Sequence, residues 1–150
     1  MEIKTIAPVT VACYKLKTNL IRIGESVQVI PNQIAQEIAV QNLQVTGAQI
    51  WQYVGCDGTP DKEFDLTIAF PVSAKGTNNK LIQFETLPAY KCASHTHNGA
   101  WSEFKEVYCT LVQQISEKGH KMDGSNRELY LHCDFENQEN CVTEIQMGLI

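Results

Sequence analysis

The chain has 150 residues, a formal net charge of −5 at pH 7 and a hydrophobic content of 43%. This length and composition predict one globular domain with a core of its own. Its lysines and arginines never occur side by side, so the sequence lacks the basic run or stripe of a protein that binds nucleic acids directly.

The N-terminal residues and the overall hydropathy predict a location for the protein. The first residues, MEIKTIAPVTVACYKLK, show no basic region followed by a sustained apolar stretch, as a secretion signal would. No window of the sequence approaches the apolar length of a membrane span. We therefore expect a cytoplasmic protein that has no membrane contact.

Six cysteines, at positions 13, 56, 92, 109, 133 and 141, raise the question of disulfides or a metal site. None of them forms a CxxC pair, and the absence of a secretion signal argues against structural disulfides. A thiol in a strand or helix pattern behaves as a small hydrophobe. We assign these cysteines no function and expect neither a metal nor a cofactor.

The first half of the chain predicts a strand, a helix and two more strands. IAPVTVACYKL (6–16) is strand-like, and PNQIAQEIAVQN (31–42) places Ile34, Ala35, Ile38 and Ala39 on one helical face. TGAQIWQYVGC (46–56) and FDLTIAFPV (64–72) follow as strands, joined by the turn-rich DGTPDKE. Residues 73–83 then form a linker, which we expect to be mobile.

The second half predicts the same order of elements. TLPAYKCASHTH (86–97) is strand-like, and AWSEFKEVYCTLVQQISEKG (100–119) is an amphipathic helix with Gly119 at its end. DGSNRELYLHC (123–133) and CVTEIQMGL (141–149) complete it as strands. One side of the helix carries a stripe at three- and four-residue spacing, made of Trp101, Phe104, Tyr108, Leu111, Val112 and Ile115.

The two halves repeat one another. Gly47, Tyr53 and Cys56 are matched 77 residues later by Gly124, Tyr130 and Cys133, and Pro8 is matched 80 residues later by Pro88. We therefore predict an α+β fold of two βαββ units, about 1–72 and 84–150, related by a pseudo-twofold axis. An antiparallel sheet would carry both main helices on one side, and they would flank a central cleft.

A candidate binding site follows from the repeat, because equivalent positions would face the same cleft. Glu128 and Tyr130 alternate with Leu129 and Leu131 along one strand, and Trp51 and Tyr53 are their equivalents. Trp101 and Phe104 on the adjoining helix would form the cleft walls. A carboxylate among aromatic rings is costly to bury until a cation joins it. The alternative that Glu128 is simply solvated stays open at this point.

The second half also carries a series of short motifs in a characteristic order. They are Leu87–Pro88, Asn98–Gly99, Lys118–Gly119, Glu128–Leu129–Tyr130 and Thr143–Glu144–Ile145. Together they resemble the GyrI-like small-molecule-binding domains, which occur as effector-binding domains of AraC- and MerR-type transcription regulators and also alone. The loop at Asn98–Gly99 departs from the commoner family form, because it lacks a proline after the glycine.

The resemblance implies a duplicated βαββ fold with a pocket for amphipathic, often cationic, drug-like compounds. It assigns Glu128 to the positive charge of the ligand and Tyr130 to the same wall. Because the resemblance uses the whole chain, it leaves no room for a DNA-reading helix-turn-helix. It therefore implies a stand-alone protein that senses or sequesters its ligand, with a role in drug resistance.

Other functions and partners stay open beside this one. A GyrI-like hydrolase would use Glu128 as a general base and Tyr130 to polarise an electrophile, although we favour a binding protein over an enzyme. His95, His97 and His132 could hold a metal or haem. An acidic protein could also inhibit a DNA topoisomerase. The Leu129/Leu131 face needs a cover, which a homodimer or a regulator protein could supply.

Overall fold

The structure is a computed structural model that describes residues 1–27 and 29–150. The first half contains two strands, two helices and two further strands: β1 Glu2–Ile6, β2 Val9–Thr18, α1 Ile23–Val27, α2 Ile30–Val40, β3 Gln49–Val54 and β4 Phe64–Pro71. The second half contains β5 Gln83–Leu87, β6 Tyr90–Asn98, a 3-10 turn Trp101–Glu103, α3 Phe104–Glu117, β7 Met122–His132, a 3-10 turn Gln138–Asn140 and β8 Val142–Leu149.

The predicted strands and both main helices are confirmed, and two strands and one short helix are additional. β1 and β5 precede the first predicted strand of each half, so each half has the order ββαββ in its main elements. The sequence prediction missed them because each is only five residues long. β5 begins at the last residue of the predicted linker.

Among the described residues, eight strands form one antiparallel sheet in the order β1-β6-β8-β7-β3-β4-β2-β5. If each strand is replaced by its equivalent in the other half (β1 by β5, β2 by β6, β3 by β7 and β4 by β8), the same order results when it is read from the opposite edge. A pseudo-twofold axis between β3 and β7 requires this. Each half gives its first strand to the other half, because β1 pairs with β6 and β5 pairs with β2. A duplication would produce this arrangement, and the duplication itself stays a prediction.

Pairing registers refine the predicted correspondence between the halves. Trp51 pairs directly with Glu128, which lies 77 residues later. Asn42 and Gly119, which have a left-handed backbone conformation just after α2 and α3, are also 77 residues apart. However, β1 begins at Glu2 and β5 at Gln83, and β2 and β6 also begin 81 residues apart. The predicted match of Pro8 with Pro88 is therefore wrong by one residue.

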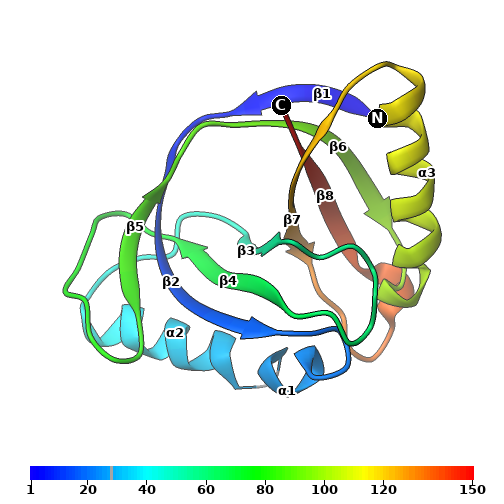
Figure 1. Cartoon of the computed structure of the whole chain (residues 1–150). Helices are drawn as coiled ribbons and strands as arrows, with labels where there is room; N and C mark the ends of the chain where they lie inside the picture. Colours follow the sequence, from blue (N-terminus) through cyan, green and yellow to red (C-terminus); the bar gives the residue numbers. More distant parts are fainter. Residues whose placement is uncertain (28) are drawn as a thin grey trace.

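Both main helices cover one face of the sheet, as predicted (Figure 1). A row of directly opposed residues crosses this face from β2 to β6: Tyr14, Ile68, Trp51, Glu128, Ile145 and His95. Ile34 and Ile38 of α2 are buried against the β2–β4 end of the row. Leu111 and Ile115 of α3 are buried against Ile145. Glu128 therefore lies between two apolar clusters.

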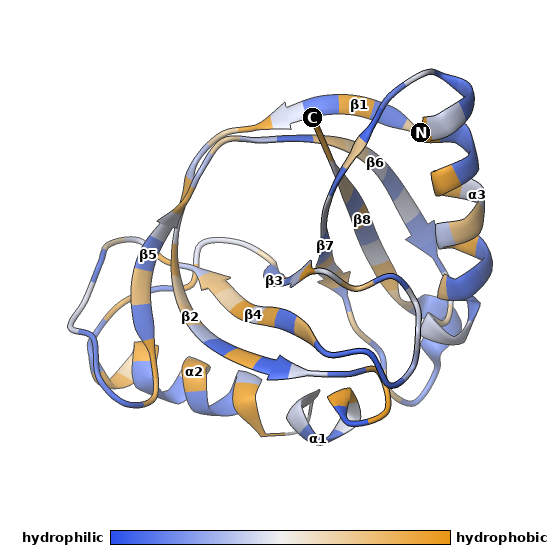
Figure 2. Ribbon diagram, in the orientation of Figure 1, coloured by the Kyte–Doolittle hydropathy of each residue, from blue (hydrophilic) through white to orange (hydrophobic). Residues whose placement is uncertain are grey.

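Part of the opposite face of the curved sheet is also buried. Hydrophobic and hydrophilic residues alternate over only part of β2 and β4 (Figure 2), because Val11–Cys13 and Ile68–Phe70 are apolar on both faces. Val11, Cys13, Ile50, Ala69 and Leu87 form a second core there, and Leu129 packs against it. Leu131 remains 50% exposed, so the predicted need for a cover applies to this residue and not to Leu129.

A buried arginine lies on this opposite face. The Arg127 side chain donates a hydrogen bond from Nε to Gln52 Oε1 at 2.8 Å, and its guanidinium lies 3.9 Å from the Tyr90 ring centroid. Burial lowers its pKa from the ordinary value. Arg127 and Glu128 are adjacent in the chain but project to opposite faces, because side chains alternate along a strand.

The predicted linker is attached to α2 by hydrogen bonds. Gln41 accepts from the Thr77 amide at 2.7 Å and donates to the Thr77 carbonyl at 2.9 Å. Asn79 donates to Glu37 at 2.8 Å. These contacts fix the entry to β5, so the segment is not a free connector.

Candidate ligand-binding site

Glu128 lies near the middle of β7 on the face that carries the helices, and only 7% of it is exposed. Its strand neighbours on that face are Trp51 of β3 and Ile145 of β8, which are 4% and 0% exposed. This burial excludes the alternative in which Glu128 is a solvated surface residue.

Three tyrosines donate hydrogen bonds to the carboxylate, and we call this group the tyrosine cage. Tyr130 and Tyr53 donate to Oε2 at 2.6 and 3.3 Å. Tyr108 donates to Oε1 at 2.7 Å and itself accepts from Asn126 Nδ2 at 3.0 Å. The cage joins β3, α3 and β7, so it connects both halves of the chain. Hydrogen bonds to a charged acceptor are stronger than those between neutral groups.

No lysine, arginine or histidine among the described residues forms an ion pair with Glu128. Burial raises the pKa of the Glu128 carboxyl above its ordinary value, and the hydrogen bonds from the tyrosines act in the opposite direction. Burial, together with the Glu128 charge, raises the pKa of each cage tyrosine well above its ordinary value. The phenols therefore stay protonated and act as donors.

Aromatic rings surround the cage in a second layer. Trp51 and Trp101 approach Tyr130 edge-on, with centroid distances of 5.9 and 6.3 Å. Phe104 approaches Tyr108 at 6.2 Å. The structure thus brings together all six predicted residues. Trp101 and Phe104 pack on Tyr130 and Tyr108, and these tyrosines donate hydrogen bonds to Glu128.

Sequence reasoning missed three members of this group. Tyr108 belongs to the apolar stripe of the helix, and the stripe alone assigns it no role; the signal is that a hydroxyl on a stripe facing a sheet needs a partner. Asn126 lies two residues before Glu128 on the same face and orients Tyr108. Phe135 lies in the β7–β8 connection and packs on Trp101 at 5.2 Å. No local pattern identifies Phe135, because its neighbours are turn formers.

Two buried polar atoms beside the cage lack a hydrogen-bond partner among the described residues. They are Trp101 Nε1 and Thr143 Oγ1. Thr143 pairs with Tyr130 across β7 and β8, and Trp101 packs on the same tyrosine. Unpaired buried polar groups are costly, so these atoms are available to a ligand or a water molecule next to Tyr130.

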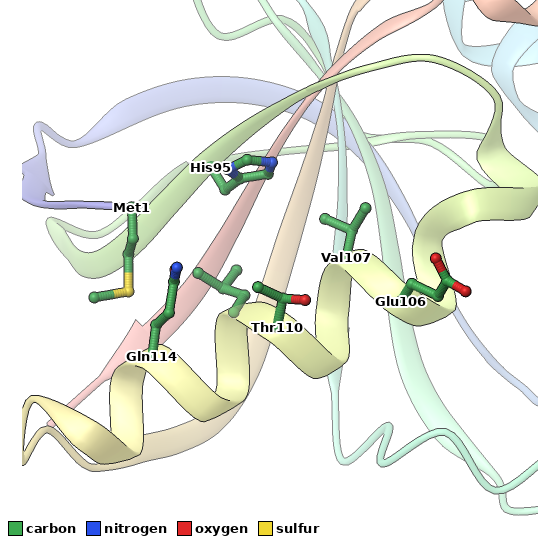
Figure 3. A pocket seen from close by; sticks show the side chains of 7 residues that line it. Met1, His95, Glu106, Val107, Thr110 and Gln114 are labelled. Atoms are coloured by element: carbon green, nitrogen blue, oxygen red, sulfur yellow. The ribbon is translucent and has the colours of Figure 1, made fainter.

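Two hollows on the protein lie away from the cage. One, of about 320 Å³, lies beside α3 and is lined by Met1, His95 and Val107 among others (Figure 3). The other, of about 260 Å³, lies beside the β3–β4 hairpin and includes Lys62 and Phe64. Glu128 lines neither of them. Because only 7% of Glu128 is exposed, a ligand that contacts its carboxylate must displace side chains of the cage or of its aromatic layer.

The three histidines of the metal hypothesis do not form a ligand cluster. Within the described residues, no group of three or more histidine, cysteine, aspartate or glutamate side chains is placed to hold a metal. His95 lines the hollow beside α3, whereas His97 packs on Phe104 and lies 3.5 Å from Glu103.

Helices long and apolar enough to cross a bilayer are not found in the described part of the chain.

The comparisons with known proteins agree with the fold. The family described as GyrI-like small molecule binding domain matches residues 1–150. None of the curated protein sequences matches the chain.

Several solved structures share the fold at low sequence identity. The C-terminal domain of EcmrR is 21% identical with a TM-score of 0.83, over 99% of this chain and 96% of that domain. The chain spans 56% of EcmrR in its DNA complex. SAV2435 bound to tetraphenylphosphonium is 18% identical with a TM-score of 0.63, over 100% and 94% of the two chains. A hydrolase from Listeria innocua is 12% identical with a TM-score of 0.65, over 99% and 92%.

Proposed function

Because this chain belongs to the GyrI-like small-molecule-binding domain family, we propose that it binds amphipathic cationic small molecules at Glu128. The observation that carries the proposal is the buried carboxylate without a basic partner among the described residues. A cation placed beside it would supply the missing opposite charge. The tetraphenylphosphonium complex of SAV2435 supports this ligand class by analogy.

The cage favours cations that lack hydrogen-bond donors. Three phenol hydroxyls already occupy both carboxylate oxygens. A delocalised or quaternary cation can attract the carboxylate and the faces of the surrounding rings without displacing these hydrogen bonds. A primary ammonium group would have to compete with the tyrosines for the same oxygens. We therefore propose Trp51, Tyr53, Trp101, Phe104 and Tyr130 as the surfaces that contact such a ligand.

Substitution of Glu128 tests the proposal with two ligands of similar shape. We expect Glu128→Gln to weaken tetraphenylphosphonium binding by about 2 kcal/mol or more, roughly thirtyfold, because the buried opposite charge is lost. Triphenylphosphine oxide, which is neutral, should lose little affinity. Titration calorimetry measures both. An equal loss for the two ligands would show that charge is not what the site recognises.

A second candidate function is hydrolysis of electrophilic compounds. It is favoured by the raised pKa of Glu128, which suits a general base, and by the tyrosine hydroxyls that could polarise an electrophile. Product formation from a panel of epoxides and activated esters, compared between the wild type and Glu128→Gln, separates turnover from binding. Equal rates for the two proteins would exclude this function for the cage.

The remaining expectations concern the setting in which the protein works. We propose a cytoplasmic protein that senses or sequesters its ligand, and a role in drug resistance follows if the ligand is toxic. Association with a second copy or with a regulator protein would cover Leu131, which is half exposed. Topoisomerase inhibition gains no support from the geometry of the cage.

A further inference from the structure

Two cysteines lie where the β7–β8 hairpin opens into its loop, one residue beyond the last pair of the two strands. His132 and Val142 are paired across the strands, and Cys133 and Cys141 are the next residues outward on each side. The Asp134 amide donates a hydrogen bond to Cys141 Sγ at 3.3 Å. The Asp134 amide nitrogen is two covalent bonds from the Cys133 Cα. The distance between Cys141 Sγ and the Cys133 Cα is therefore at most roughly 6 Å.

This geometry suits a disulfide. Directly opposed residues of an antiparallel pair, such as His132 and Val142, have Cα atoms roughly 4.5 to 5.5 Å apart. Cys133 and Cys141 are the next residues, and the two hydrogen bonds between Cys141 Sγ and the Asp134 backbone keep them close. Disulfides span Cα separations of roughly 4.4 to 6.8 Å. Both thiols are free in the structure. A covalent bond between them therefore requires rotation of the two side chains and little movement of the backbone.

The two thiols differ in access. Cys133 is exposed, whereas Cys141 is 0% exposed. Partial burial raises the pKa of the Cys133 thiol, and the neighbouring Cys141 adds to this. An oxidant in solution can therefore reach Cys133 first, and Cys141 can react only with a group already attached to Cys133.

We propose that Cys133 and Cys141 form a reversible disulfide when the protein meets an oxidised low-molecular-weight thiol such as glutathione disulfide. The Cys133 thiolate attacks one sulfur of that disulfide, forms a mixed disulfide and releases one glutathione thiolate. The Cys141 thiolate then attacks the Cys133 sulfur, closes the bond and releases the second glutathione. The two cysteines are oxidised, the glutathione disulfide is reduced, and two protons are released to solvent or to the glutathione thiolates.

The bond would close a ring that contains Phe135. This residue is 68% exposed, packs on Trp101 and through it reaches Tyr130 of the cage. A closed ring would hold Phe135 against Trp101 and slow the entry of a ligand to Glu128. This consequence rests on the proposed function, whereas the disulfide itself does not.

The disulfide is tested on the full chain, first reduced and then incubated with glutathione disulfide. Cleavage after Glu136 and Glu139 separates the two cysteines, so mass spectrometry identifies a linked pair of peptides. We expect this link in the wild type and in Cys109→Ser, the control that removes another exposed thiol. Cys141→Ser should accumulate glutathione on Cys133, because nothing resolves the mixed disulfide. A wild type that retains glutathione on Cys133 to the same extent would overturn the proposal.

The consequence for ligand entry has its own readout. Stopped-flow mixing with tetraphenylphosphonium should show slower association for the oxidised wild type than for the reduced wild type, and no such change for Cys133→Ser. If the link forms and the association rate is unchanged, the gating role is wrong but the modification site stands. If the ligand does not bind in either state, the proposed function fails and the disulfide remains a separate result.

Discussion

At the scale of single residues, Glu128 is a carboxylate in an enclosed aromatic environment. Its carboxylate is buried, held by three phenols and not balanced by a basic side chain among the described residues. Burying a charge costs free energy that hydrogen bonds recover only in part. The buried charge to which we attribute affinity for a cation therefore also lowers the stability of the unliganded protein.

Stability should depend on pH in a direction set by Glu128. Burial raises its pKa in the folded state, so the folded protein binds the proton more tightly than the unfolded chain. The contribution of Glu128 to the free energy of unfolding is therefore full below its ordinary pKa of 4.5 and is lost as pH rises through the folded-state value. We expect Glu128→Gln to be more stable than the wild type at pH 8, with a difference that shrinks on acidification.

Urea denaturation at several pH values measures this difference. The control is Glu106→Gln on the exposed side of α3, which should leave the pH profile of stability unchanged. A wild type that gains stability relative to Glu128→Gln as pH rises would contradict the expected sign.

At the scale of single elements, the connector between the halves owes its position to close packing against α2. Gly76 lies where a Cβ atom would meet Gln41 Oε1 and would come within 2.8 Å of Phe84 Cζ. The Gln41 side chain also accepts a hydrogen bond from the Thr77 amide and donates one to the Thr77 carbonyl. The glycine therefore lets the chain run along α2 before it enters β5.

Gly76→Ala should lower the free energy of unfolding by about 1 to 3 kcal/mol, because the added methyl group overpacks this contact. Gly24→Ala is the matched control, since a Cβ there meets nothing within 4 Å and the position is helical. Thermal unfolding followed by circular dichroism compares the two variants. If both melt at the same temperature, the connector is not held as tightly as its contacts indicate.

For the whole molecule, the exchange of first strands makes the two halves depend on each other. β2 lies between β4 and β5, and β5 comes from the second half. Ile82 and Phe84, which flank the start of β5, belong to the core beneath α2. The first half alone would therefore lose an edge strand, part of its core and the β7 partner of β3.

We expect a fragment of residues 1–80 to lack a cooperative unfolding transition by circular dichroism. Mixing it with residues 81–150 should restore the transition, because the missing strands return. The intact chain serves as the reference. A cooperative transition for residues 1–80 alone would show that the first half folds without the second.

Local patterns in the sequence predicted much of this protein. Alternation with period two located six of the strands, three- and four-residue spacing located α2 and α3, and Gly119 marked the end of α3. These signals are local because they depend on backbone geometry within one element. The repeat then related Trp51 and Tyr53 to Glu128 and Tyr130, and the family resemblance is confirmed.

Only the tertiary structure decided how the two halves share their strands and how Glu128 is surrounded. The pairing of β1 with β6 and of β5 with β2 depends on long-range register, which no local pattern encodes. The hydrogen bond from Tyr108 depends on where α3 lies relative to β7, and the contact of Phe135 with Trp101 depends on the path of a loop. The sequence by itself determined six of the eight strands, both main helices and the residues of the cage in β3 and β7, because these depend on local periodicity. Packing between distant segments determined that the carboxylate is enclosed, because it depends on how α3 and the β7–β8 loop lie against the sheet.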